Sequence, residues 1–104
     1  LYRLEQGGYF SLGDFLRQFA IDGRARIEKM HSALAAGDVA ALEREAHTLK
    51  GGSRELGAQR LSELCFELEK MARAGGWEIG EERVRDIAGE FEAVQEELAR
   101  RRKG

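Results

Sequence analysis

The chain has 104 residues, of which 42% are hydrophobic and 35% charged, and it contains no proline. This length suits one domain with a single hydrophobic core, and the composition argues against disorder. The net charge of −2 gives no reason to expect nucleic acid or an anionic membrane as a partner. No apolar run approaches the ~20 residues that a membrane span requires, and no signal peptide is visible. Because one cysteine cannot form an internal disulfide, we expect Cys65 to be a reduced core residue of a cytoplasmic protein.

Periodic apolar residues predict four amphipathic helices within a single domain over residues 1–104, after a short N-terminal extension at 1–10. The first helix is expected at about 12–36, and Ser11 with Asp14 forms a capping box at its start. Its apolar stripe, spaced by three and four residues, comprises Leu12, Leu16, Phe19, Gly23, Ile27, Met30 and Leu34. The glycine on this stripe is expected to let another helix approach closely.

The remaining helices follow after short connections. Gly37 ends the first helix and Asp38 caps the second, which is expected at about 38–56. The third is expected at about 58–74 and the fourth at about 80–102. Trp77, Ile79 and the phenylalanines are expected to pack in the core or in the turns. Four such segments without a strand signal predict an all-α, antiparallel up-down-up-down four-helix bundle, which can close its core as a monomer.

The second predicted helix carries an exposed histidine. His47 lies roughly 130° from the centre of the apolar stripe of that helix, so we expect it to face solvent. Lys50 follows one turn later, and Gly51 lies almost directly above the histidine. Two successive glycines inside a helix cost roughly 2 kcal/mol relative to alanines. Because the apolar stripe continues in phase beyond them, we expect an unbroken helix in which Gly51 leaves room for the backbone of a partner.

Chemistry alone leaves three roles open for His47. A general base would need a companion carboxylate or serine, and the sequence shows none arranged for that role. A metal or haem ligand would need partners, and His31, the other histidine, has no HxxxH or Cys/His cluster beside it. A phosphoryl acceptor needs exposure, a neutral ring nitrogen and a nearby cation, which Lys50 provides and Arg54 could supplement from the same face. A bundle surface supplies neither an ATP pocket nor Mg²⁺ ligands, so partners would bring both.

The segment around this histidine resembles the histidine-containing phosphotransfer (HPt) domain. The family pattern reads roughly A-H-x-L-K-G-x-S, then L-G-A, and then a third helix with L-x-x-L-C-x-x-L-E. The matching residues are Ala46-His47-Thr48-Leu49-Lys50-Gly51-Gly52-Ser53, Leu56-Gly57-Ala58, Leu61, Leu64-Cys65 and Leu68-Glu69. The similarity covers approximately residues 10–100. One departure is Gly52, where the family commonly has a small serine or alanine.

The resemblance implies a phosphoryl carrier, without an ATP site of its own, that moves phosphate between aspartates of response-regulator receiver domains. His47 would be phosphorylated, usually at Nε2 in the family, Lys50 would stabilise the phosphate, and Gly51 would leave room for the receiver. Arg54 is a further candidate for contact with phosphate or partner. No cofactor is expected on this domain, since the receiver brings Mg²⁺ and its own acidic pocket. The expected partners are receiver domains and a hybrid sensor histidine kinase in the same or another chain.

Other functions fit the sequence as well. The chain could be the phosphoacceptor module of a chemotaxis-type histidine kinase, which takes phosphate from an ATP-binding domain. It could also be a helical bundle that binds receivers without accepting phosphate, or a haem or metal bundle that uses His31 and His47. His31 itself lies on the flank of the first apolar stripe and is expected to be a structural histidine.

Overall fold

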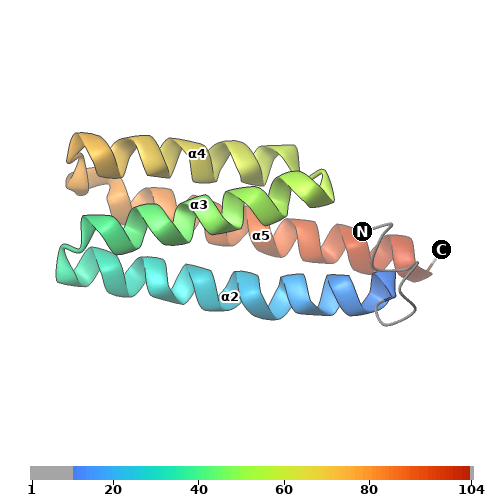
Figure 1. The fold of residues 1–104 in the computed structure, drawn as a ribbon. Helices are drawn as coiled ribbons and strands as arrows, with labels where there is room; N and C mark the ends of the chain where they lie inside the picture. Colours follow the sequence, from blue (N-terminus) through green and yellow to red (C-terminus); the bar gives the residue numbers. More distant parts are fainter. Residues whose placement is uncertain (1–10, 104) are drawn as a thin grey trace.

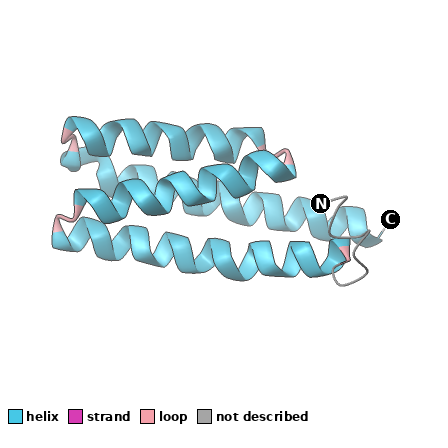
Figure 2. Cartoon of the chain, in the orientation of Figure 1, coloured by secondary structure: helices cyan, strands magenta, loops and turns pink. Residues whose placement is uncertain are grey.

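The computed structural model describes residues 11–103 and consists of helices joined by short turns. The extension expected at 1–10 lies outside the described residues. The four long helices are α2 (Leu12–Ala36), α3 (Val39–Leu56), α4 (Gln59–Ala74) and α5 (Gly80–Lys103), and a 3₁₀ turn, η1 (Trp77–Ile79), precedes α5. Successive helices run antiparallel (Figure 1), and the described part of the chain contains no strand (Figure 2). The predicted all-α, antiparallel four-helix bundle is therefore confirmed.

Side-chain caps and a left-handed glycine set the first helix boundaries. The hydroxyl of Ser11 accepts a hydrogen bond from the backbone of Asp14, whose carboxylate accepts one from the backbone of Ser11. Gly37 ends α2 with φ of 68°, a conformation that side chains with a Cβ disfavour. The Asp38 carboxylate accepts a hydrogen bond of 3.0 Å from the Ala41 backbone, so Asp38 is the N-cap and α3 begins one residue later than predicted.

The core runs along the axis of the bundle. α3 packs against α2 and α4, and α5 packs against the same two helices, which leaves α2 and α4 diagonally opposite (Figure 1). A Cβ added to Gly23 would stand 2.3 Å from a ring carbon of Phe91 in α5. The predicted close approach at Gly23 is therefore confirmed, and the approaching group is an aromatic ring. Cys65 is buried as predicted, and this burial raises the pKa of its thiol to about 12.

Three apolar residues that were expected to pack in the core or in the turns are exposed. Leu12 is 46% exposed because it is the first residue of α2, where the bundle ends, and Ile79 is 40% exposed in the short turn before α5. Phe66 is also 46% exposed, although it follows the buried Cys65 in the middle of α4. One step along a helix turns a side chain by about 100°, and at Phe66 this turn leads off the buried face.

No helix among the described residues combines the length and the apolar character that crossing a bilayer requires.

Candidate functional site

His47 stands on α3 beside a carboxylate of α4. Its side chain is 69% exposed, which confirms the orientation predicted from helix phasing. Its Nδ1 lies 3.0 Å from Oε2 of Glu69, whose side chain is only 3% exposed. An exposed ring is therefore tied at one nitrogen to a buried carboxylate. Nε2 is the ring nitrogen left for chemistry.

Two cations hold Glu69 in place. Nζ of Lys50 lies 2.6 Å from Oε1, and a guanidinium nitrogen of Arg73 lies 3.6 Å from Oε2. Burial alone would raise the pKa of Glu69, but the hydrogen bonds from Lys50 and His47 outweigh it, and the pKa lies below its ordinary value. The side chain is therefore a carboxylate near neutral pH and can only accept hydrogen bonds. Because Glu69 accepts, Nδ1 of His47 must carry the proton, and the neutral ring keeps its lone pair on Nε2.

Glu69 matches the family pattern in the sequence, but it was given no role there, and the expectation that His47 has no companion carboxylate is wrong. Glu69 is 22 residues from His47 in the chain, and only the rotation of α4 against α3 brings the two together. A signal for it does exist. Glu69 falls among the buried residues of α4, between Leu68 and Met71, and a carboxylate in such a position needs a cation or a donor.

The predicted cations occupy different positions. The Lys50 side chain is 13% exposed, pairs with Glu69, and lies 5.0 Å from the ring centroid of Phe66. Arg54 is exposed and borders a shallow recess with Gly57, Gln59, Ser62 and Glu63. The structure therefore connects Lys50 to His47 through one shared carboxylate. It provides no such connection for Arg54 within residues 11–103.

Arg73 is a cation that the sequence analysis did not single out. Its Nε donates to Glu43 over 2.8 Å, and the rest of its guanidinium reaches toward Glu69. Because Glu43 precedes His47 by one helical turn, Arg73 joins α4 to α3 on the side of His47 opposite to Lys50.

The two glycines leave the helix intact and the surface open. α3 continues through Gly51 and Gly52 to Leu56, as predicted. A Cβ added to Gly51 would meet nothing within 4 Å, whereas one added to Gly52 would lie 3.6 Å from the ring of Phe19. Gly51 is therefore the glycine of the pair that faces free space, one turn above His47.

His31 makes a similar but exposed contact. Its Nδ1 lies 3.1 Å from Oε1 of Glu81, with the side chains 44% and 62% exposed. The two histidines thus pair with carboxylates of different helices, α5 for His31 and α4 for His47. Residues 11–103 contain no group of three or more histidine, cysteine, aspartate or glutamate side chains that could hold a metal ion. The arrangement gives no support to a haem or metal site built from both histidines.

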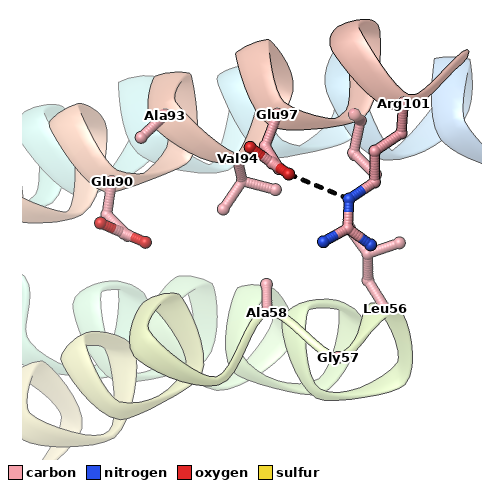
Figure 3. A pocket seen from close by; sticks show the side chains of 9 residues that line it. Leu56, Gly57, Ala58, Glu90, Ala93, Val94, Glu97 and Arg101 are labelled. Atoms are coloured by element: carbon pink, nitrogen blue, oxygen red, sulfur yellow. Dashed lines mark hydrogen bonds and ion pairs between the residues drawn. The ribbon is translucent and has the colours of Figure 1, made fainter. Parts of the chain in front are cut away.

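A recess of about 250 Å³ lies beside the turn between α3 and α4 (Figure 3). Its lining consists of Leu56, Gly57, Ala58, Glu90, Ala93, Val94, Glu97, Leu98 and Arg101. Within it, Arg101 donates to Glu97 over 2.9 Å, and the lining includes no histidine, serine or cysteine. The recess is about 15 Å along the helix axis from His47, at 1.5 Å per residue. It is separate from the histidine site.

Comparison with known proteins points to one family. The family model of the Hpt domain matches residues 14–102. The crystal structure of histidine-containing phosphotransfer protein B (HptB) from Pseudomonas aeruginosa PAO1 is similar, with a TM-score of 0.81 and 36% sequence identity. That similarity covers 86% of this chain and 77% of that chain. No curated protein matches the sequence.

Proposed function

The chain belongs to the Hpt domain family and is a phosphorelay histidine phosphotransfer intermediate, and we propose that His47 carries its phosphoryl group. The observation that supports this assignment is the contact of 3.0 Å between Nδ1 and the buried Glu69, combined with an exposed ring. His31 is the other histidine of the chain, and its carboxylate partner is exposed.

The reaction begins with the lone pair on Nε2. This pair attacks the phosphorus of an aspartyl phosphate on a receiver domain, a P–N bond forms, and the P–O bond to the aspartate breaks. The aspartate leaves as a carboxylate, and the proton on Nδ1 stays where it is. The reverse sequence passes the phosphoryl group to another receiver. Because the transition state of phosphoryl transfer is loose, catalysis consists mainly of positioning and charge stabilisation.

Glu69 is a positioning residue in this scheme. It fixes the tautomer and the orientation of the ring, and it stabilises the positive charge that develops on the imidazole as Nε2 bonds to phosphorus. Lys50 keeps Glu69 ionised and in place. The ammonium of Lys50 has three N–H donors, and the contact with Glu69 does not use all of them. Lys50 can therefore also direct a donor toward the phosphoryl group.

The remaining parts of the proposal concern the partner. Hpt domains in phosphorelays interact with receiver domains. We propose that response-regulator receivers, including one of a hybrid sensor histidine kinase, exchange phosphate with this chain as a cytoplasmic monomer. Gly51 lets the receiver backbone approach, and Arg54 is available to the phosphate or the partner. Mg²⁺ belongs to the receiver, and this domain needs no cofactor of its own.

The test is phosphoryl transfer from a phosphorylated receiver domain, with Mg²⁺, to the wild-type chain and to His47→Gln. We expect an acid-labile, base-stable label on the wild type alone, because phosphohistidine has that stability. Equal labelling of the Gln variant would show that His47 is not the carrier. Binding of the receiver without any label on the wild type would support a receiver-binding bundle that does not accept phosphate.

A further inference from the structure

Phe66 is an exposed aromatic ring in the middle of α4, and two ammonium groups lie close to it. Nζ of Lys50 lies 5.0 Å and Nζ of Lys70 lies 4.8 Å from its ring centroid. Lys50 comes from α3 and Lys70 from the next turn of α4. Of the other large apolar residues that are exposed in the described part of the chain, Leu12 and Ile79 lie at the ends of elements and Ile21 lies within α2. A single exposed apolar residue needs no explanation, but a ring that two cations contact is a more specific arrangement.

The cations restrict the motion of this ring. Lys50 is itself fixed, since its side chain is 13% exposed and its ammonium lies 2.6 Å from Glu69. Binding a partner to a ring that is already oriented loses less side-chain entropy than binding to a free one. Aromatic side chains of this kind are also the usual anchors of protein interfaces.

Phe66 is close to the phosphoacceptor. Three contacts lead from Nδ1 of His47 to the ring: 3.0 Å to Glu69, 2.6 Å from Glu69 to Lys50, and 5.0 Å from Lys50 to the ring centroid. Including the width of the carboxylate, the centroid lies within about 13 Å of Nδ1. A protein interface that covers about 800 Å² on each partner has a radius of about 16 Å. A receiver that brings its aspartate to His47 therefore covers Phe66 if it is centred on the histidine.

We propose that Phe66 is an aromatic anchor of the surface on which the receiver domain docks, with Lys70 at the rim of the contact. This proposal rests on the proposed function and specifies its partner surface, placing the receiver over α3 and α4. The exposed ammonium of Lys70 would attract acidic side chains of the receiver at the edge of the contact. The edge of the Phe66 ring is apolar, so its burial against the receiver adds affinity. The ring itself takes no part in the chemistry.

The test compares two matched variants, Phe66→Ser and Ile21→Ser. Ile21 is also an exposed apolar residue, 64% exposed, but it lies on α2, which is diagonal to α4. The measured quantities are the dependence of the transfer rate on receiver concentration and the lifetime of the phosphohistidine without receiver. The donor is the phosphorylated receiver domain that labels the wild-type chain.

For Phe66→Ser we expect the half-saturating receiver concentration to rise about tenfold, as for a truncated interface anchor. For this variant, the rate at saturating receiver and the phosphohistidine lifetime should stay within about twofold of the wild type. For Ile21→Ser, the half-saturating concentration, the saturated rate and the lifetime should all stay within that range. Lys70→Ala should flatten the salt dependence of the transfer rate at low receiver concentration.

Three results would overturn the proposal. The first is a half-saturating concentration for Phe66→Ser close to that of the wild type. The second is a shortened phosphohistidine lifetime with unchanged half-saturation, which would mean that Phe66 acts through Lys50. The third is altered self-association of the variant without a change in receiver binding, which would assign the ring to a contact between copies of this chain. In each case a label that still depends on His47 leaves the proposed role of His47 standing, whereas a label on the His47→Gln variant would overturn the assignment of His47 as the carrier.

Discussion

Two histidines of this bundle make nearly the same contact and differ in what surrounds it. Nδ1 of His47 lies 3.0 Å from an oxygen of Glu69, and Nδ1 of His31 lies 3.1 Å from an oxygen of Glu81. The Glu69 side chain is 3% exposed, whereas the Glu81 side chain is 62% exposed. Water competes for an exposed carboxylate, so the contact with Glu81 restrains its histidine only weakly.

The burial and the ion pairs of the carboxylate, rather than its distance from the histidine, therefore decide how firmly the imidazole is held. Lys50 and Arg73 both approach Glu69 and leave it little freedom to move. Among residues 11–103, Glu81 forms an ion pair with His31 alone. The imidazole at His47 is therefore held in one tautomer by a fixed group, and the imidazole at His31 is not.

The largest expected effect separates the two histidines directly. His31→Gln should still accept one phosphoryl group per chain, and His47→Gln should accept none, because only His47 has both an exposed ring and a fixed carboxylate. Intact-protein mass spectrometry after transfer from a phosphorylated receiver counts the groups. Two groups on the wild type, or one on His47→Gln, would remove the distinction between the sites.

Replacing each carboxylate by an amide separates the two sites in a second way. Glu69→Gln should slow phosphoryl transfer by about tenfold to hundredfold, by analogy with the loss of carboxylate partners from metal-bound histidines. The amide can still accept from Nδ1, but it carries no charge to stabilise the imidazolium. Glu81→Gln serves as the matched control, and rapid-quench kinetics should find its transfer rate equal to that of the wild type. If the two variants behaved alike, the buried position of Glu69 would have no role in the reaction.

The third difference is the residue one turn after each histidine, Gly51 after His47 and Ala35 after His31. Gly51→Leu should slow transfer by about tenfold because the new side chain stands where the receiver approaches. It should also stabilise the fold by about 0.5–1 kcal/mol, since glycine is a poor helix former and a Cβ at Gly51 meets nothing within 4 Å. Ala35→Leu should leave transfer unchanged. Thermal unfolding and transfer rates together check this prediction, and normal transfer by Gly51→Leu would refute the steric argument.

The two histidines also differ in the residue three positions later, which is Lys50 after His47 and Leu34 after His31. We expect the loss of Lys50 to have a smaller effect than the changes above. Lys50→Met should shorten the phosphohistidine lifetime or slow transfer by about fivefold, in line with the loss of one interaction of about 1 kcal/mol. Arg54→Met, the matched loss of a nearby exposed cation, should have a smaller effect. Equal effects of the two variants would argue that only the overall charge matters.

The smallest effect concerns stability against acid. The pKa of Glu69 lies below its ordinary value of 4.5 in the folded chain, so the unfolded chain binds more protons between the two values. The stability that Glu69 adds is therefore present above pH 4.5 and is lost as the pH falls through the lower, folded value. Denaturant titrations of Glu69→Gln should show a smaller loss of unfolding free energy between pH 7 and acid than the wild type shows. Identical losses would mean that the ion pairs of Glu69 do not stabilise the fold.

Most of the fold could be predicted because its signals are local. The capping box at Ser11, the stop at Gly37 and the phase of the apolar residues each depend on neighbours in the chain. The exposure of His47 followed from the same helical phasing. Phe66 was expected in the core or in the turns from its residue type, although the same helical phasing places it off the buried stripe of α4.

The candidate site could be predicted only in part, for a related reason. His47, Lys50 and Gly51 lie within five residues on one helix, so their order was visible in the sequence. Glu69 and Arg73 come from α4, and their distances to α3 depend on how two helices pack, which no local pattern specifies. Lys50 also makes a contact that was not expected, because its ammonium pairs with Glu69, the carboxylate that contacts His47.

NMR of the imidazole nitrogens in an isotopically labelled chain, before and after phosphorylation by a receiver, would identify the nitrogen that carries the phosphoryl group. We expect His47 to carry its proton on Nδ1 in the free chain, and to show a phosphorus–nitrogen coupling at Nε2 once phosphorylated, with the signals of His31 unchanged. A phosphoryl group on Nδ1 of His47, or on either nitrogen of His31, would show that Nε2 of His47 is not the phosphoacceptor.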